Sequence, residues 1–228
     1  MANTNTSEFT VVMKLLLALA CMLLTPSTTH ALSIDFAASV SQPSLKIKSV
    51  SNDTVLAEMV DKASIWPSVS LKTKERYFYD SNFGYSAEAM AWYMKLDRQK
   101  VSSKEVNLGT SARGYFAYLT PTLYYRFGDK YSMDSSDWMT TIGVGLGVGY
   151  LNVKGTMMTT GTSPNRFGRI DDIGFGLSSG LYVEIMKDRW FLRFTSFGPA
   201  LNNGTVNLEL RDNSIKIGRR FNFNLFSD

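Results

Sequence analysis

The sequence has one cysteine, Cys21, and one histidine, His30, and both lie within its first 31 residues. Residues 13–31 join a lysine to a short apolar run and end in small residues up to Ala31, which is typical of a cleaved secretory signal peptide. We therefore expect residues 1–31 to be removed. The mature chain would then have no disulfide, no cysteine nucleophile, no zinc site of the usual kind and no histidine acid–base pair.

The lack of cysteine and histidine also bears on metals, cofactors and catalysis. We predict no catalytic site, no metal site and no cofactor, so the chain is not expected to be an enzyme. Two alternatives stay open for the amino-terminal segment, namely a lipoprotein site at Cys21 and a buried or membrane helix. Translation could also start at Met13 rather than at Met1.

Long hydrophobic runs and a strong charge are also absent. No stretch after residue 31 approaches the 18 or more apolar residues of a transmembrane helix. Removing Lys14 and Glu8 with the signal peptide leaves a net charge of 23 − 19 = +4. This small excess is not clustered and does not favour nucleic-acid binding. The remaining 228 − 31 = 197 residues are enough for one domain, expected over 32–228.

Glycine is abundant in one place. Residues 140–150 read TTIGVGLGVGY, with a glycine at every second position: Gly143, Gly145, Gly147 and Gly149. A dinucleotide-binding loop needs the spacing G-x-G-x-x-G before a helix, and this stretch does not have it. A period of two is that of a β-strand, so the glycines share one face and bulky apolar residues share the other.

The same alternation recurs along the chain. It predicts strands near 84–96, 114–127, 138–153, 173–186, 190–198 and 214–226, a seventh near 65–75, and an eighth within 33–50, preferably at SLKIKSV. Residues 51–64 read as a short helical or irregular segment. Strands of about ten or more residues suit a tilted crossing of a bilayer, and long connections alternate with short ones. We predict an all-β fold, a closed antiparallel up-and-down transmembrane β-barrel of eight strands.

The two faces of these strands differ in chemistry. A soluble lipocalin-like barrel would keep its apolar face inside, whereas a membrane barrel would turn it outward. The opposite face mixes glycine with large polar groups, and the interior of an eight-stranded barrel only just holds its side chains. We therefore predict a lumen glycine strip formed by the four glycines above. We also predict a lumen charge network of Glu88, Arg126, Glu184, Arg193 and Arg220.

The lumen charges have two interpretations, a closed set of ion pairs or a narrow ion path. Glu184 and Arg193 lie on adjacent predicted strands across a tight turn, so they are expected to pair. The neighbours Arg219 and Arg220 break strict alternation. Either Arg219 extends outward to the membrane interface, or a bulge at Gly218 turns both arginines inward.

Several stretches carry a family resemblance: the signal peptide, YLTPTLYYRFG, GVGLGVGYLNV, GFGLSSGLYVEI and SIKIGRRFNF. Together they resemble the small outer-membrane β-barrel family of Gram-negative bacteria, similar to the membrane domain of OmpA. The resemblance covers 114–226 well and 33–100 loosely. It implies location in the outer membrane, contact with its lipid and lipopolysaccharide, and assembly by the barrel-insertion machinery. The family pattern has a terminal aromatic residue, whereas here two residues follow Phe226.

The basic residues of the predicted outer loops are expected either near the anionic lipopolysaccharide surface or simply in solvent: Lys100, Lys104, Arg113, Arg166 and Arg169. We predict a structural or surface-interaction role without catalysis, with a possible extracellular partner bound through the loops. The alternatives are a narrow small-solute or ion channel and a soluble periplasmic lipocalin-like binding barrel.

Overall fold

The computed structural model describes residues 31–101, 104–127, 138–158 and 167–224. Residues Ala31–Phe223 form one compact unit, and its described parts are built from strands. No helix in these ranges is long and apolar enough to cross a membrane. The predicted signal peptide, apart from Ala31, lies outside the described residues and stays a prediction.

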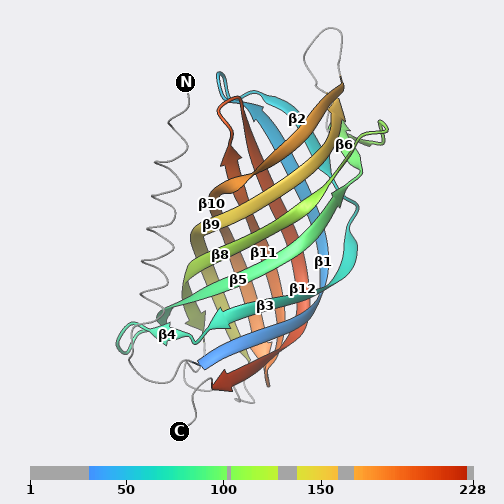
Figure 1. Cartoon of the computed structure of the whole chain (residues 1–228). Coiled ribbons are helices and arrows are strands. Elements are labelled where there is room, and N and C mark those ends of the chain that lie inside the picture. Colours follow the sequence, from blue (N-terminus) through green and yellow to red (C-terminus); the bar gives the residue numbers. More distant parts are fainter. Residues whose placement is uncertain (1–30, 102–103, 128–137, 159–166, 225–228) are drawn as a thin grey trace. The chain divides into compact units, whose positions relative to one another are not determined.

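The sheet closes on itself. Its ring follows the order β12-β11-β10-β9-β8-β5-β3-β1, and β12 also pairs with β1 (Figure 1). Consecutive ring strands are antiparallel, so the described chain forms the predicted closed up-and-down barrel with eight strands in its ring. The strands are β1 (Ala31–Ser49), β2 (Val55–Val60), β3 (Ser64–Thr73), β4 (Arg76–Tyr77), β5 (Phe83–Leu96), β6 (Arg98–Val101), β7 (Lys104–Val106), β8 (Ser111–Phe127), β9 (Met139–Met158), β10 (Phe167–Lys187), β11 (Trp190–Asn202) and β12 (Val206–Asn224).

Four short strands lie outside the ring. β4 pairs with β5, while β2 pairs with the later part of β1 and continues through β6 to β7. β2 corrects our expectation of a helical or irregular segment over 51–64. Its ladder with β1 places Met59 opposite Leu45 and buries Ala57 and Met59 at alternate positions. Pairing with β1 on one side and with β6 on the other supplies hydrogen bonds and burial that outweigh the local preference.

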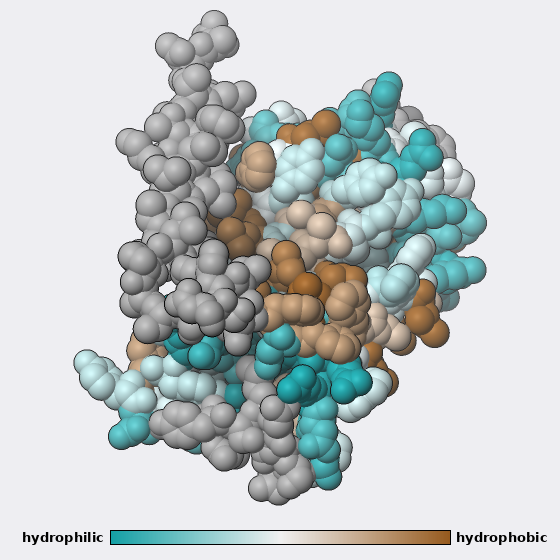
Figure 2. All heavy atoms as spheres, turned by 60° about the horizontal axis from the view of Figure 1, so that its bottom comes forward, coloured by the Kyte–Doolittle hydropathy of each residue, from teal (hydrophilic) through white to brown (hydrophobic). Residues whose placement is uncertain are grey.

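The outer face of the ring is apolar. Leu146 and Leu177 are each 65% exposed, whereas Arg126 and Glu184 are 1% exposed. Hydrophobic side chains gather in a patch of the surface seen in Figure 2, with hydrophilic ones beside it. This arrangement is the reverse of a soluble barrel and suits a hydrocarbon surround. We call the outward side chains the apolar belt: Phe36, Val40, Val69, Leu71, Leu123, Ile142, Val144, Leu146, Phe175, Leu177, Leu181, Phe194, Ile215 and Ile217.

The two adjacent arginines of β12 take opposite directions. The ladder from Trp190↔Arg219 through Phe191↔Gly218 is continuous, so Gly218 forms no bulge. Arg219 faces outward, with its guanidinium 5.8 Å from the Trp190 ring centre and 5.4 Å from that of Phe221. Arg220 faces the lumen and is 1% exposed. The outward arginine therefore lies among aromatic rings near a strand end, where a lipid-facing cation costs little.

Candidate functional site in the barrel lumen

Eight charged side chains meet in the lower part of the lumen, towards the end where β10 turns into β11. Period-two alternation points each strand residue inward, and all eight are buried. Four are acidic and four are basic, so their formal charges cancel. We call this set the lumen charge cluster: Asp35, Lys72, Glu75, Glu88, Arg126, Glu184, Arg193 and Arg220.

Arg193 of β11 lies at the centre of the cluster. Its Nε donates to Glu184 Oε2 at 2.7 Å, and its Nη1 donates to Glu88 Oε1 at 2.9 Å. Its Nη2 donates to Asp35 Oδ2 at 3.0 Å. One guanidinium therefore joins carboxylates from β10, β5 and β1, which lie on different sides of the ring.

Arg220 of β12 binds two of the carboxylates that Arg193 also contacts. Its Nε and Nη2 donate to Asp35 Oδ1 and Oδ2, both at 2.8 Å, which is a bidentate pair. Its Nη1 and Nη2 donate to Glu184 at 3.2 and 2.9 Å. Asp35 and Glu184 are therefore each shared between two arginines.

Glu75 extends the cluster. It lies in the short connection between β3 and β4 and accepts a hydrogen bond from Lys72 Nζ at 2.7 Å. Arg126 Nη2 also donates to Glu75, and Arg220 Nη1 lies 3.6 Å from Glu75 Oε1. Arg126 Nε in turn donates to the hydroxyl of Thr141 on β9 at 3.2 Å. All eight ring strands thus contribute to the cluster or to its contacts.

The structure brings all five sequence-predicted charges into this cluster, namely Glu88, Arg126, Glu184, Arg193 and Arg220. The predicted pairing of Glu184 with Arg193 is confirmed, since the two residues are also register partners. Sequence reasoning missed three members. Asp35 and Lys72 lie at alternate positions that face the lumen, but the sequence analysis located their two strands only approximately. Glu75 lies beyond a strand end, where alternation gives no direction.

The predicted glycine strip on β9 faces large inward groups. A Cβ at Gly143 would meet the Tyr182 ring, and one at Gly145 would lie 3.0 Å from the Phe197 ring. At Gly149 it would lie 2.5 Å from Pro199 Cβ. These positions have no room for a side chain, because residues of β10 and β11 occupy the space in front of them.

The upper part of the lumen is apolar, which the sequence analysis did not predict. Side chains from both the ring and β2 fill it, and many have no exposed surface. The inward faces of the ring strands therefore carry apolar side chains in the upper lumen and charged side chains in the lower lumen. Its members include Leu45, Ile47, Met59, Met94, Leu96, Phe116, Leu151, Val153, Ile170, Leu208 and Leu210.

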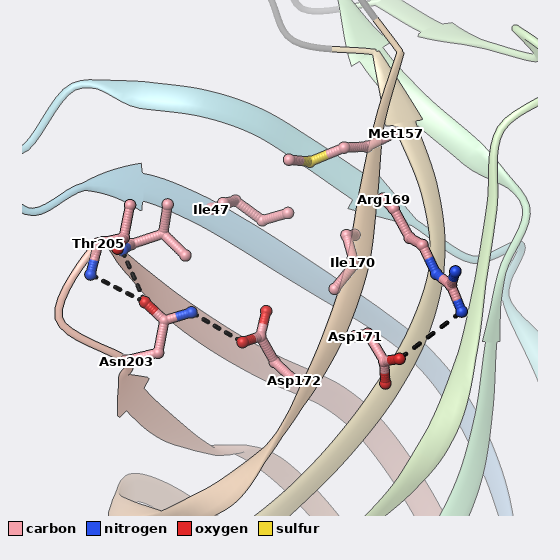
Figure 3. A pocket seen from close by; sticks show the side chains of 9 residues that line it. Ile47, Met157, Arg169, Ile170, Asp171, Asp172, Asn203 and Thr205 are labelled. Carbon is pink, nitrogen blue, oxygen red and sulfur yellow. Dashed lines mark hydrogen bonds and ion pairs between the residues drawn. The ribbon is translucent and has the colours of Figure 1, made fainter. Parts of the chain in front are cut away.

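A pocket of about 500 Å³ opens at the upper end, between β10 and the β11–β12 turn (Figure 3). Asn203 Nδ2 donates to Asp172 at 2.7 Å on the inward side of β10, beside Ile170. Arg169 and Asp171 pair at 3.7 Å on the other side of the same strand. The lining therefore combines a polar rim with apolar groups that continue into the upper core.

The basic residues expected at the outer surface differ in their surroundings. Lys100 Nζ lies 3.1 Å from Glu58, so β6 and β2 are joined by an ion pair. Lys104 and Arg113 are exposed. Arg166 lies outside the described residues. Among the described parts of the chain, no group of three or more histidine, cysteine, aspartate or glutamate side chains could hold a metal ion.

Comparisons with known proteins show similarity in structure only. No family model matches the sequence, and no curated protein matches it. The crystal structure of Ail, the attachment invasion locus protein of Yersinia pestis, aligns at 12% identity over 85% of this chain and 100% of Ail, with a TM-score of 0.43. One Ail structure is in complex with the heparin analogue sucrose octasulfate.

Two further structures are similar. Neisserial surface protein A aligns at 12% identity over 82% of this chain and 97% of its own, with a TM-score of 0.39. The N-terminal β-barrel domain of Pseudomonas aeruginosa OprF aligns at 10% identity over 78% and 96%, with a TM-score of 0.26. The described residues of the present chain form a closed antiparallel up-and-down β-barrel, with eight strands in its ring and an apolar exterior.

Proposed function

We propose that this chain is an outer-membrane barrel with a structural and surface-interaction role, with no catalytic activity and with a lumen that does not conduct. The observation that carries the proposal is the pairing of four acids with four bases in the lower lumen, beneath an apolar upper core. Both layers consist of buried side chains, so closure does not depend on one constriction.

Moving an ion through this lumen would be energetically costly. An ion crossing the lower lumen would have to separate guanidinium–carboxylate pairs, and an unpaired buried charge costs several kcal/mol. The same ion would then meet the apolar side chains of the upper core, which cannot replace its hydration shell. The bidentate contact of Arg220 with Asp35 and the three-way contact of Arg193 favour a brace across the barrel rather than a path through it.

Planar-bilayer recording tests closure directly. We expect the barrel to show no steady unit conductance. Heat-modifiable migration of the same sample checks that the protein has inserted. A steady conductance that also changes in Arg193→Met would contradict closure and would instead support the narrow channel.

The surface role concerns the upper end. The proposed partners in the membrane are outer-membrane lipid and lipopolysaccharide, and the barrel-insertion machinery during assembly. The β6–β7 hairpin and the pocket beside Asp172 are the surfaces we propose for an extracellular partner. We expect the chain in the outer-membrane fraction, with β6 and β7 cleaved by protease added to intact cells. Recovery in the soluble periplasmic fraction would contradict the proposal.

A further inference from the structure

The barrel wall is incomplete between β3 and β5. Their ladder contains only three pairs, Ser70↔Met90, Leu71↔Ala89 and Lys72↔Glu88. Beyond Ser70, residues 64–69 continue to pair with β1 on their other side, and β5 continues to pair with β8. The two strands diverge towards the upper end of the barrel (Figure 1). Each therefore has a free edge facing the other.

A pocket of about 190 Å³ lies at this divergence. We call it the wall slot. Consecutive residues 66–68 of β3 and 90–94 of β5 line it, which means that the strand edges themselves form its sides. Its inner lining comes from buried residues of β1, the ring neighbour of β3, and of β12, namely Ser39, Ser41 and Asp212. The slot thus leads from the outer surface of the ring into the upper lumen.

The slot opens within the lipid-facing part of the wall. Val69 and Leu71, just below it on β3, belong to the apolar belt, and Ile65 above is 74% exposed. Tyr93, on the outer face of β5 at the mouth, is an exposed aromatic residue of the kind found where hydrocarbon meets head groups. Lys95, two residues above Tyr93 on the same face of β5, is exposed. The mouth therefore lies at the upper edge of the belt.

The inner end of the slot is amphipathic. Met90 and Met94 belong to the apolar upper core, while Ser41 donates a hydrogen bond to the buried Asp212. The Trp92 Nε1 is buried and has no hydrogen-bond partner among the described residues. Lys216 Nζ, itself buried, lies 3.0 Å from the Met90 sulfur and 5.8 Å from the Trp92 ring centre.

Asp61 lines the slot from the connection between β2 and β3 and is half-buried, so the rim of the slot is partly shielded from water. The volume selects a slender occupant, because an engineered apolar cavity of about 150 Å³ holds one benzene molecule. A third β-strand laid between the two edges would not fit in such a space.

We infer that the wall slot binds the hydrocarbon chain of an outer-leaflet lipid, which enters sideways between β3 and β5. The chain contacts Met90, Met94 and Trp92, and the polar linkage near its head group lies at the mouth. The free donor of Trp92 suits a hydroxyl or ester oxygen carried by that chain. The inference rests on the proposed membrane location.

Quenching of single tryptophans tests the inference. Trp92 is kept alone by W66F, W138F and W190F, and the barrel is reconstituted in phosphatidylcholine vesicles with brominated or unbrominated chains. A second protein keeps only Trp190, which is 56% exposed on the outer face. We expect brominated chains to quench Trp92 to an extent comparable with Trp190, although the Trp92 ring packs inside the barrel against Phe116.

A variant whose wall slot is filled distinguishes entry of a lipid chain into the slot from quenching of Trp92 across the barrel wall. Ser68→Phe fills the lining of the slot, whereas Ser179→Phe on β10 leaves it unchanged. We expect Ser68→Phe to remove the quenching of Trp92 and Ser179→Phe to retain it. Quenching that persists in Ser68→Phe, or is absent from Trp92 while Trp190 is quenched, would overturn the slot. Absence of quenching at Trp190 would instead refute the membrane location.

Discussion

Replacing Arg220 by methionine should cost the barrel about 3–5 kcal/mol of folding free energy, the range for removing one partner of a buried ion pair. Arg220 makes four hydrogen bonds of 2.8–3.2 Å to Asp35 and Glu184. Methionine keeps much of the volume but leaves a net charge of −1 in the cluster. Arg193 would then be the only arginine of the cluster still in contact with both of these carboxylates.

The neighbouring residue provides a matched control. Arg219→Met removes the same charge from the same strand, but Arg219 faces outward. A lipid-facing arginine near an interface costs about 0–1 kcal/mol. Its contacts with Trp190 and Phe221 are worth about 0.5–1 kcal/mol at an exposed site. The two effects oppose each other, so the control should stay within about 1 kcal/mol of the parent.

Urea titration of the folded barrel in vesicles, followed by tryptophan fluorescence and by migration of unheated samples, measures both variants. Adding Asp35→Asn to Arg220→Met should recover part of the loss, with a coupling of about 0.5–3 kcal/mol. If Arg220→Met and Arg219→Met cost the same, the cluster does not brace the barrel and the reasoning fails.

Three further substitutions test the core, the glycine strip and the apolar belt by the same titration. Phe116→Ala should cost about 3–5 kcal/mol, because the side chain is fully buried in the upper core; a cost below that of a surface substitution would mean that the upper lumen is loosely filled. Gly143→Val should cost about 1–3 kcal/mol through overlap with the Tyr182 ring, and adding Tyr182→Ala should relieve that overlap; no relief would argue against the proposed packing. Leu146→Lys should cost about 2–4 kcal/mol if the residue faces hydrocarbon, whereas a neutral result would place it in water.

The ring strands were predictable because two signals agree along them. Period-two alternation and runs of ten or more residues recur along the sequence from residue 84 onward, and β9 shows both most clearly through its glycines. β2 was missed although it forms a hairpin with the preceding β1; of its two partners, only β6 is remote in sequence. The apolar upper lumen was also missed, because inward and outward apolar faces look alike where both are bulky.

The members of the lumen charge cluster also differ in whether the sequence could predict them. Arg126, Glu184 and Arg193 lie on strands with clear alternation, so their direction followed from parity. Glu75 lies past the end of β3, and only its contacts with Lys72 and Arg126 reveal its role. The wall slot could not have been foreseen, because it depends on where one ladder stops rather than on any local pattern.

The central claim is that the apolar belt meets lipid, and a nitroxide label on Leu146→Cys tests it most directly. A chain beginning at residue 32 has no other cysteine, so labelling is specific. In vesicles, the account predicts that the label collides readily with oxygen and rarely with a water-soluble nickel chelate. A label that is protected from oxygen and accessible to the chelate would place Leu146 in water and contradict the account.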